Sequence, residues 1–319
     1  MKYRSSFLPL AAALVFSLGC SSTLHTGASL DRDFSEGVSS DVQTLVSIKL
    51  DQVKASELYR RHQQLLALPQ FNDLAARAGL DPRRDISSLC VIWDGKHLML
   101  LAKGAFTNAQ LEAKLIANGA QRVSYKNFTL LTRGADSVAF PKPGFAVASS
   151  TGAVQSELDL LLSKSGAIPD EIKARLADVP SDSQIWEVSR GGLPGTGFAL
   201  RSDLDSALSN FANFVTGTSF GMRFDAGAHL LARVICKSPE GAQRVNDAMR
   251  GLIGLARLST KDNELDLLRL WDSVSITKER QFVKVQADLS ADLSDKLIDK
   301  VVAVRGHAGA AVTPQQTPQ

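Results

Sequence analysis

The sequence predicts an α+β protein of two loosely repeated units, each an antiparallel sheet with helices packed on one face. Three observations lead to this prediction. The chain has 319 residues, 44% of them hydrophobic, which is enough for one large core or two ordinary ones. Short apolar runs separated by turn residues alternate with helical stretches, as in sheets that helices cover. The same order of elements, from a first strand through a hairpin to a last helix, occurs twice.

The first unit is expected over residues 42–167. It opens with a β-rich run at 42–50, followed by helical stretches that Pro69 interrupts and that end at Gly79. Asp94 and Gly95 then lie between two apolar runs, which is a strong hairpin signal.

A helix follows the first hairpin. Thr107 and Gln110 have the spacing of a capping box, and Gly119 is placed to end the helix. We expect strands after it at 122–133, 136–144 and 145–150, and a closing helix at 153–164.

The second unit is expected over residues 184–305, after a linker at 168–183 that contains a short helix. A strand at 185–190 precedes a helix that Ser202 caps, and a hairpin turns at Asp225, Ala226 and Gly227. Ser238 and Pro239 start a long helix. A second hairpin at 274–290 and a last helix at 291–304 complete the unit.

The amino terminus has the pattern of an export signal. Lys2 and Arg4 precede an apolar stretch at 7–18, which is too short to cross roughly 30 Å of hydrocarbon as a helix. We therefore expect residues 1–19 to be a signal peptide. The rest of the chain carries 34 basic and 33 acidic residues, so it offers no basic field for nucleic acid, and we expect no nucleic-acid partner.

The residues Ser17, Leu18, Gly19 and Cys20 resemble the lipobox of bacterial lipoproteins, except that Ser17 stands where that family favours Leu. The resemblance implies cleavage between Gly19 and Cys20, and a lipid anchor on Cys20. Several acyl chains would hold the protein on a bilayer. Ser21 and Ser22 are not the acidic residue that retains such proteins in the inner membrane, so the resemblance favours the outer membrane. The alternative is an ordinary signal peptide and a soluble periplasmic or secreted protein.

The two ends of the mature chain lack an apolar period. Residues 20–41 are rich in Ser, Gly and Asp, and we expect a flexible tether there. Residues 306–319 are rich in Ala, Thr, Pro and Gln, and we expect a disordered tail.

No catalytic or metal-binding motif is found, so we expect no cofactor, no metal and no enzymatic activity. The five histidines, at 25, 62, 97, 229 and 307, form no metal-binding spacing. The glycine-rich run at 191–197 lacks the Lys and the Ser or Thr of a phosphate loop. Cys90 and Cys236 lie in apolar runs, which favours buried free thiols over a disulfide.

An aromatic cluster is the candidate binding feature. Phe211, Phe214, Phe220 and Phe224 lie close together in sequence and precede a largely apolar helix. Such a cluster is usually core. The alternative is a crevice for a ligand or partner.

Four short motifs resemble a family of uncharacterised exported bacterial proteins. They are Asp81 to Asp85 before a strand, the hairpin at Asp94, the run from Gly104 to Phe106, and the run from Val138 to Phe140. The resemblance implies export and a duplicated α+β body, without an activity.

These observations together predict an envelope-anchored lipoprotein that acts by binding, as an accessory or scaffold subunit beside another envelope protein. One alternative is a periplasmic carrier of an apolar ligand. The other is an enzyme whose active site is assembled from dispersed residues.

Overall fold

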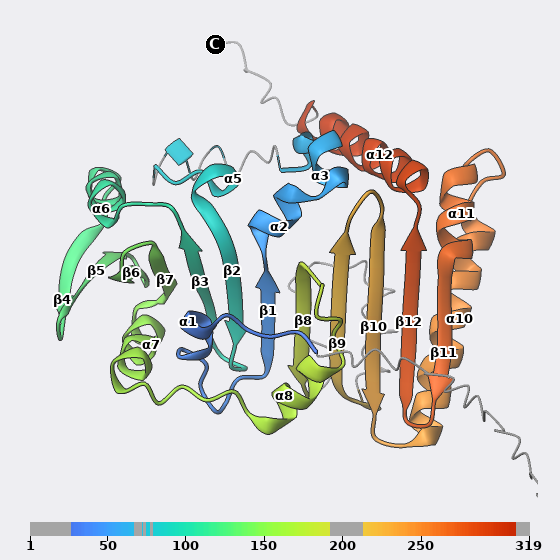
Figure 1. Cartoon of the computed structure of the whole chain (residues 1–319), viewed down its shortest axis with the longest axis horizontal. Helices are drawn as coiled ribbons and strands as arrows, with labels where there is room; N and C mark the ends of the chain where they lie inside the picture. The colour runs from blue at the N-terminus through green and yellow to red at the C-terminus, as the bar shows by residue number, and fades with distance from the viewer. Residues whose placement is uncertain (1–26, 67–71, 73–74, 77–78, 192–212, 311–319) are drawn as a thin grey trace, which may run out of the picture.

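The computed structural model describes residues 27–66, 72, 75–76, 79–191 and 213–310, and its strands form one twelve-stranded antiparallel sheet (Figure 1). The α+β class is confirmed. The sheet order is β11-β12-β10-β9-β8-β1-β2-β3-β7-β6-β5-β4. The strands are β1 (Thr44–Ile48), β2 (Ile86–Trp93), β3 (Leu98–Gly104), β4 (Gln121–Tyr125), β5 (Phe128–Arg133), β6 (Asp136–Lys142), β7 (Phe145–Ser150), β8 (Ile185–Arg190), β9 (Val215–Phe224), β10 (Ala228–Cys236), β11 (Val274–Glu279) and β12 (Phe282–Leu289).

The helices lie on both faces of the sheet and beyond its ends. They are α1 (Arg32–Ser35), α2 (Leu50–Ala55), α3 (Glu57–Arg61), the 3-10 turn η1 (Gln63–Leu66), α5 (Pro82–Asp85), α6 (Asn108–Ala117), α7 (Thr151–Ser163), α8 (Asp170–Ala177), α10 (Pro239–Ser259), α11 (Leu265–Ser273) and α12 (Ala291–Ala310). None of these described helices is both long and apolar enough to span a bilayer.

A pair of first strands joins the two halves of the sheet. β1 and β8 are antiparallel neighbours, with Leu45 opposite Val188. Outward from this pair, one half has the order β1-β2-β3-β7-β6-β5-β4 and the other β8-β9-β10-β12-β11. In both halves the last strand returns beside the third. One continuous sheet therefore runs through both expected units.

The larger core covers one face of the sheet. Phe34 of α1, Leu158 of α7 and Ile172 of α8 are fully buried against sheet residues that include Leu45 and Trp186. Complete burial of such a side chain contributes about 1.5–3 kcal/mol. These helices therefore pack on one face of the sheet, and Figure 1 shows α1 and α8 in front of its central strands.

The second core lies on the opposite face. Val234 of β10 packs in a cluster with Ala242 and Val245 of α10. The preceding residue, Arg233, instead forms an ion pair with Asp178 at the end of α8. Because successive strand residues point to opposite faces, α8 and α10 lie on different sides of the sheet.

Several expected local signals are confirmed. Gly95 has a positive φ of 96° in the β2–β3 turn, and Asp94 and Gly95 do connect the two strands. Ser238 caps α10 by accepting a hydrogen bond from the amide of Gly241. Thr107 precedes α6, but its side chain makes no capping hydrogen bond, so the predicted capping box does not form.

The expected ends of the folded body need correction. Residues 27–41 are not a tether, because they form α1 and bury Phe34 and Val38 completely. One aromatic residue on a short helix produces no visible period, which is why the segment looked polar. The last helix, α12, continues to Ala310, five residues into the predicted tail. The structure does not describe the predicted signal peptide, residues 20–26 or residues 311–319. Of the helix expected after Ser202, it describes only residues 213–215.

Candidate functional site

An apolar hollow lies between α12, the β9–β10 hairpin and the α2–α3 segment. We call it the α12 hollow, and it encloses about 280 Å³. The described residues that line it are Val53, Ser56, Leu58, Tyr59, Met222, Phe224, Ala228, Leu289, Ser294, Leu297 and Ile298.

Two serine hydroxyls line this hollow, and both are occupied by backbone groups. Ser56 ends α2 and caps α3. Its Oγ donates to the carbonyl of Val53 over 2.7 Å and accepts from the amide of Tyr59 over 3.1 Å. The hydroxyl of Ser294 donates to the carbonyl of Leu289 over 3.4 Å. With these groups already bonded, the walls offer mainly carbon surface, which suits an apolar ligand.

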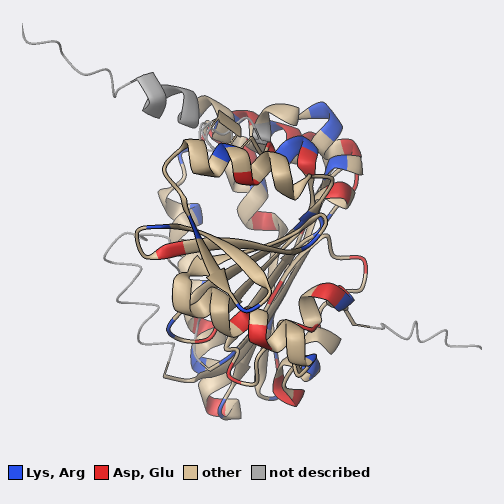
Figure 2. Cartoon of the chain, turned by 90° about the vertical axis from the view of Figure 1, so that its left-hand side faces the viewer, with Lys and Arg blue, Asp and Glu red and all other residues tan. Residues whose placement is uncertain are grey.

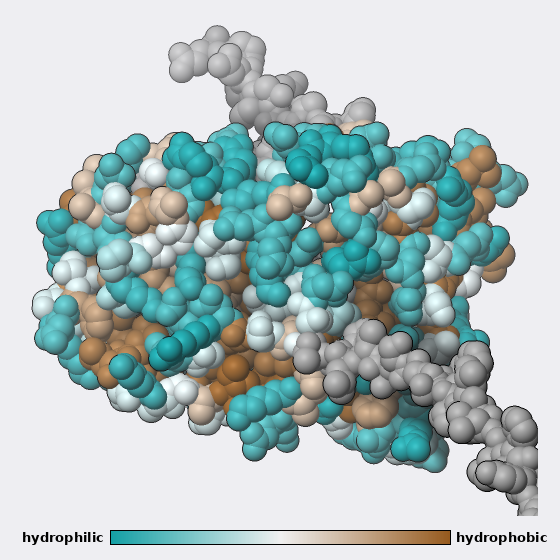
Figure 3. All heavy atoms as spheres, in the orientation of Figure 1, coloured by the Kyte–Doolittle hydropathy of each residue, from teal (hydrophilic) through white to brown (hydrophobic). Residues whose placement is uncertain are grey.

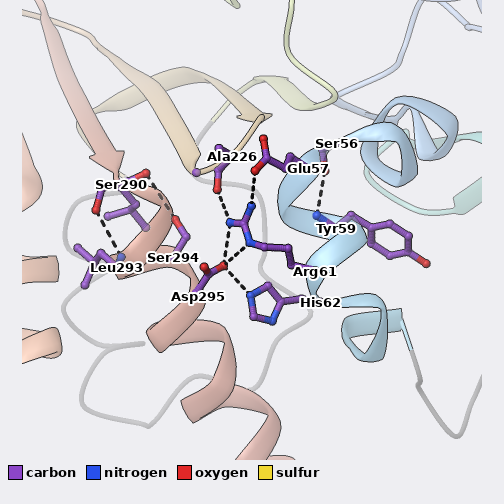
Figure 4. A network of polar contacts seen from close by, with 12 residues as sticks. Ser56, Glu57, Tyr59, Arg61, His62, Ala226, Ser290, Leu293, Ser294 and Asp295 are labelled. Carbon is purple, nitrogen blue, oxygen red and sulfur yellow. Dashed lines mark hydrogen bonds and ion pairs between the residues drawn. The ribbon is translucent and has the colours of Figure 1, made fainter.

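A polar clamp of Arg61, His62 and Asp295 joins the elements around the hollow (Figure 4). The guanidinium of Arg61 donates to the carbonyl of Ala226 over 2.7 Å and to the carboxylate of Asp295 over 2.9 Å. A third contact joins it to Glu57 over 3.0 Å. One side chain of α3 thus binds the β9–β10 turn and α12 at once.

The second contact of the clamp comes from a buried histidine. His62 is 6% exposed, and its Nε2 lies 2.6 Å from Oδ1 of Asp295. The side-chain amide nitrogen of Gln64, Nε2, lies 3.3 Å from Nδ1 of His62. An ionised carboxylate can only accept, so Nε2 of His62 donates to Asp295.

The clamp keeps Asp295 ionised. Burial by itself would raise the pKa of this carboxyl, but the hydrogen bonds from Arg61 and His62 outweigh it and lower the pKa. The clamp therefore places a fixed ion pair beside an apolar hollow.

The four phenylalanines of the expected crevice are not all brought together. Phe214 precedes β9 and packs against the α10 core, with Arg244 over its ring at 5.2 Å. Phe224 ends β9 and lines the α12 hollow. At about 3.3 Å per residue, the two lie roughly 30 Å apart. Phe220 lies half-buried between them on β9, and Phe211 lies outside the described residues.

The other predicted residues have separate places. Gly19 and Cys20 lie outside the described residues. Cys90 and Cys236 are buried free thiols, as expected, and burial raises the pKa of each. Within the described chain, no group of three or more His, Cys, Asp or Glu residues could hold a metal ion. His97 and His229 are each bound by aspartates beside their own hairpin turn.

The clamp has no signal in the sequence. Arg61 and Asp295 are 234 positions apart, and each lies on a helix whose charged residues have the ordinary pattern of a solvated face. No spacing in the sequence could pair them.

No family model and no curated protein matches this chain. Among solved structures, the chain is similar to crystal forms I and III of TP0453. Form I has a TM-score of 0.46 and 11% identity, over 86% of this chain and 98% of that one. Form III has a TM-score of 0.46 and 12% identity, over 86% and 99%.

Proposed function

We propose that the protein is an envelope-anchored lipoprotein that binds an apolar ligand, such as one acyl chain, in the α12 hollow. The observation that carries this proposal is the carbon lining of the hollow, whose two serine hydroxyls are already bonded to backbone. Of the alternatives, the carrier fits this geometry best. The volume of the α12 hollow, about 280 Å³, is near the lower end for ligand pockets, so a slender group fits better than a bulky one.

Methionine methyl NMR can test the ligand. The chain has four methionines, and Met222 lines the α12 hollow whereas Met249 packs in the α10 core. Titration of methyl-labelled protein with octanoic acid should shift the Met222 signal in a saturable way and leave Met249 in place.

A variant with a larger side chain in the α12 hollow tests the ligand site. Leu297→Trp should weaken octanoate binding at least tenfold, because the larger ring occupies the space. Leu255→Trp, on the exposed surface of α10 at 63% exposure, should bind as the wild type does. If Leu297→Trp is unfolded, Ala228→Leu provides a smaller filling. Unchanged affinity in a folded filled variant would exclude this ligand site.

The anchor has its own test. Mass spectrometry of protein from its own envelope fraction should give a mature chain that begins at Cys20 and carries diacylglycerol and acyl chains. An unmodified chain would instead support a soluble exported protein. It would leave the ligand proposal standing, because the α12 hollow does not depend on the anchor.

A second candidate function is that of a subunit that contacts another envelope protein. Leu255, Leu258 and Leu265 of α10 and α11 are 63%, 84% and 64% exposed. Figure 3 shows hydrophobic residues at the right-hand edge, where Figure 1 places these helices. Leu258→Ser should reduce the size of the complex extracted in mild detergent, whereas Leu98→Ser, at an exposed position on β3, should not.

The two halves of the sheet support a duplication. We infer that residues 42–167 and 184–305 are repeats, because the last strand of each returns beside its third strand and is followed by a helix. The first has two additional strands in its meander. An experimental structure with a different strand order in either half would contradict the inference.

A further inference from the structure

A second hollow lies under α7, in the other half of the sheet. We call it the α7 hollow, and it encloses about 450 Å³, within the ordinary range for ligand pockets. The segment 37–41, the β2–β3 hairpin and α7 form its walls. Ile92, Met99 and Leu160 supply an apolar part of the lining.

The inner wall holds an unpartnered carboxyl group. Glu157 is 3% exposed, and its Oε1 has no hydrogen-bond partner. Desolvation raises the pKa of Glu157 to about 8. A buried carboxyl group without a hydrogen-bond partner costs free energy. A ligand that donates a hydrogen bond to Glu157 would remove this cost.

Gly37 makes room for this carboxyl. A Cβ added at Gly37 would overlap Oε1 of Glu157. The glycine therefore lets the 37–41 segment pass directly over the acid and keeps its oxygen within the wall of the hollow.

The remaining charges of the hollow are mostly negative. Asp41 and Asp94 line it together with His97, and its described lining contains no lysine or arginine. Burial would raise the pKa of Asp94, but hydrogen bonds from the amides of His97 and Lys96 outweigh this and lower it. The side chain of His97 lies 3.1 Å from Asp94, so this histidine is already paired.

The geometry points to a binding site for a small organic amine in the α7 hollow, with its ammonium at Glu157 and its carbon chain against Ile92 and Met99. An ammonium supplies the donors that the orphaned carboxyl lacks, and it complements Asp41 and Asp94. A bare metal ion would need three or more ligands that converge, and the described residues form no such group. The site goes beyond the proposed binding of an apolar ligand and uses none of the same residues.

Methionine methyl NMR tests this site separately from the other one, because Met99 lines the α7 hollow and Met222 the α12 hollow. Butylamine should shift the Met99 signal in a saturable way and leave Met222 unmoved. 1-Butanol and butyrate, of the same chain length, should bind at least tenfold more weakly. Equal binding of all three, or an unmoved Met99, would overturn the proposal.

The variants replace an ionisable carboxyl group by an amide of nearly the same size. Glu157→Gln should weaken butylamine binding at least tenfold, whereas Glu279→Gln, at an exposed position of the edge strand β11, should bind as the wild type does. The Met222 and Met249 signals report whether each variant is folded. If Glu157→Gln fails to fold, Asp41→Asn should still weaken binding severalfold. Wild-type affinity in a folded Glu157→Gln chain would refute the assignment.

Discussion

The α7 hollow and the α12 hollow occupy corresponding places in the two halves of the sheet. Each lies between the turn of a central hairpin, β2–β3 or β9–β10, and the helix that follows the last strand of its half. Figure 1 shows α7 near the lower end of the sheet and α12 near the upper end. The first hollow contains an orphaned acid, and the second is lined with carbon. A shared topology thus positions a cavity, and a few side chains decide its chemistry.

The surroundings of the hollows also differ in how charge is handled. At the α12 hollow, Arg61 forms an ion pair with Asp295 and His62 is hydrogen-bonded to the same carboxylate. At the α7 hollow, the described lining contains no lysine or arginine that could pair with Glu157. Figure 2, which views the half that contains α7, shows acidic and basic residues interspersed along the chain. The buried acid without a hydrogen-bond partner is therefore a local property of the hollow.

The largest expected effect comes from Glu157→Gln at alkaline pH. The pKa of Glu157 is raised from its ordinary value of 4.5 to about 8, so between these values the folded chain holds a proton that the unfolded chain has released. The contribution of Glu157 to the free energy of unfolding is therefore most favourable below about pH 4.5, and it falls as pH rises to about 8. Glu157→Gln removes this loss, so it should be more stable than wild type by about 4–5 kcal/mol at pH 9 and nearly equal at pH 4.

Urea unfolding at pH 4 and pH 9 would measure this difference. Asp41, Asp94 and His97 face the same hollow and are present in both chains, so their titration cancels to first order. Glu279→Gln is the control and should match wild type at both pH values. An equal stability gain at both pH values would show that charge is not the cause.

A smaller effect is expected from Gly37→Ala. The added methyl overlaps the Glu157 carboxyl and should cost roughly 2 kcal/mol. In a Glu157→Ala background this cost should fall by more than half, because the clash is gone. Gly152→Ala is the matched control, since this helical glycine of the same hollow has open space around it and should be neutral or slightly stabilising. Equal costs in both backgrounds would contradict the close approach.

The smallest effect should come from Asp295→Asn at the other hollow. The ionised carboxylate binds Arg61 and His62, so its loss should raise hydrogen exchange of the α12 amides severalfold without global unfolding. Because the pKa of Asp295 is lowered, the wild type should keep this protection above about pH 4 and lose it as pH falls further. Glu279→Gln, at an exposed position of β11, is the control. Exchange that does not change in Asp295→Asn would show that packing alone holds α12.

Local signals made the elements predictable and left the cavities hidden. Asp94 and Gly95 identified a hairpin, and Ser238 identified the start of α10, because turn and cap geometry depends on neighbours in sequence. Glu157 had a weak signal, since it lies four positions from buried Ala153 on an otherwise apolar helix face. The prediction for residues 27–41 was wrong because the buried residues Phe34 and Val38 are isolated among polar residues and form no apolar period.

The sequence by itself determined the α+β class and most strands and hairpins, since periodicity and turn chemistry act over a few residues. Tertiary structure alone decided that β1 and β8 join the two halves into one sheet, and that Asp295 meets Arg61 and His62. It also placed Gly37 against Glu157. These contacts connect residues far apart in the chain, and only the packed sheet and helices bring them within reach of short-range forces.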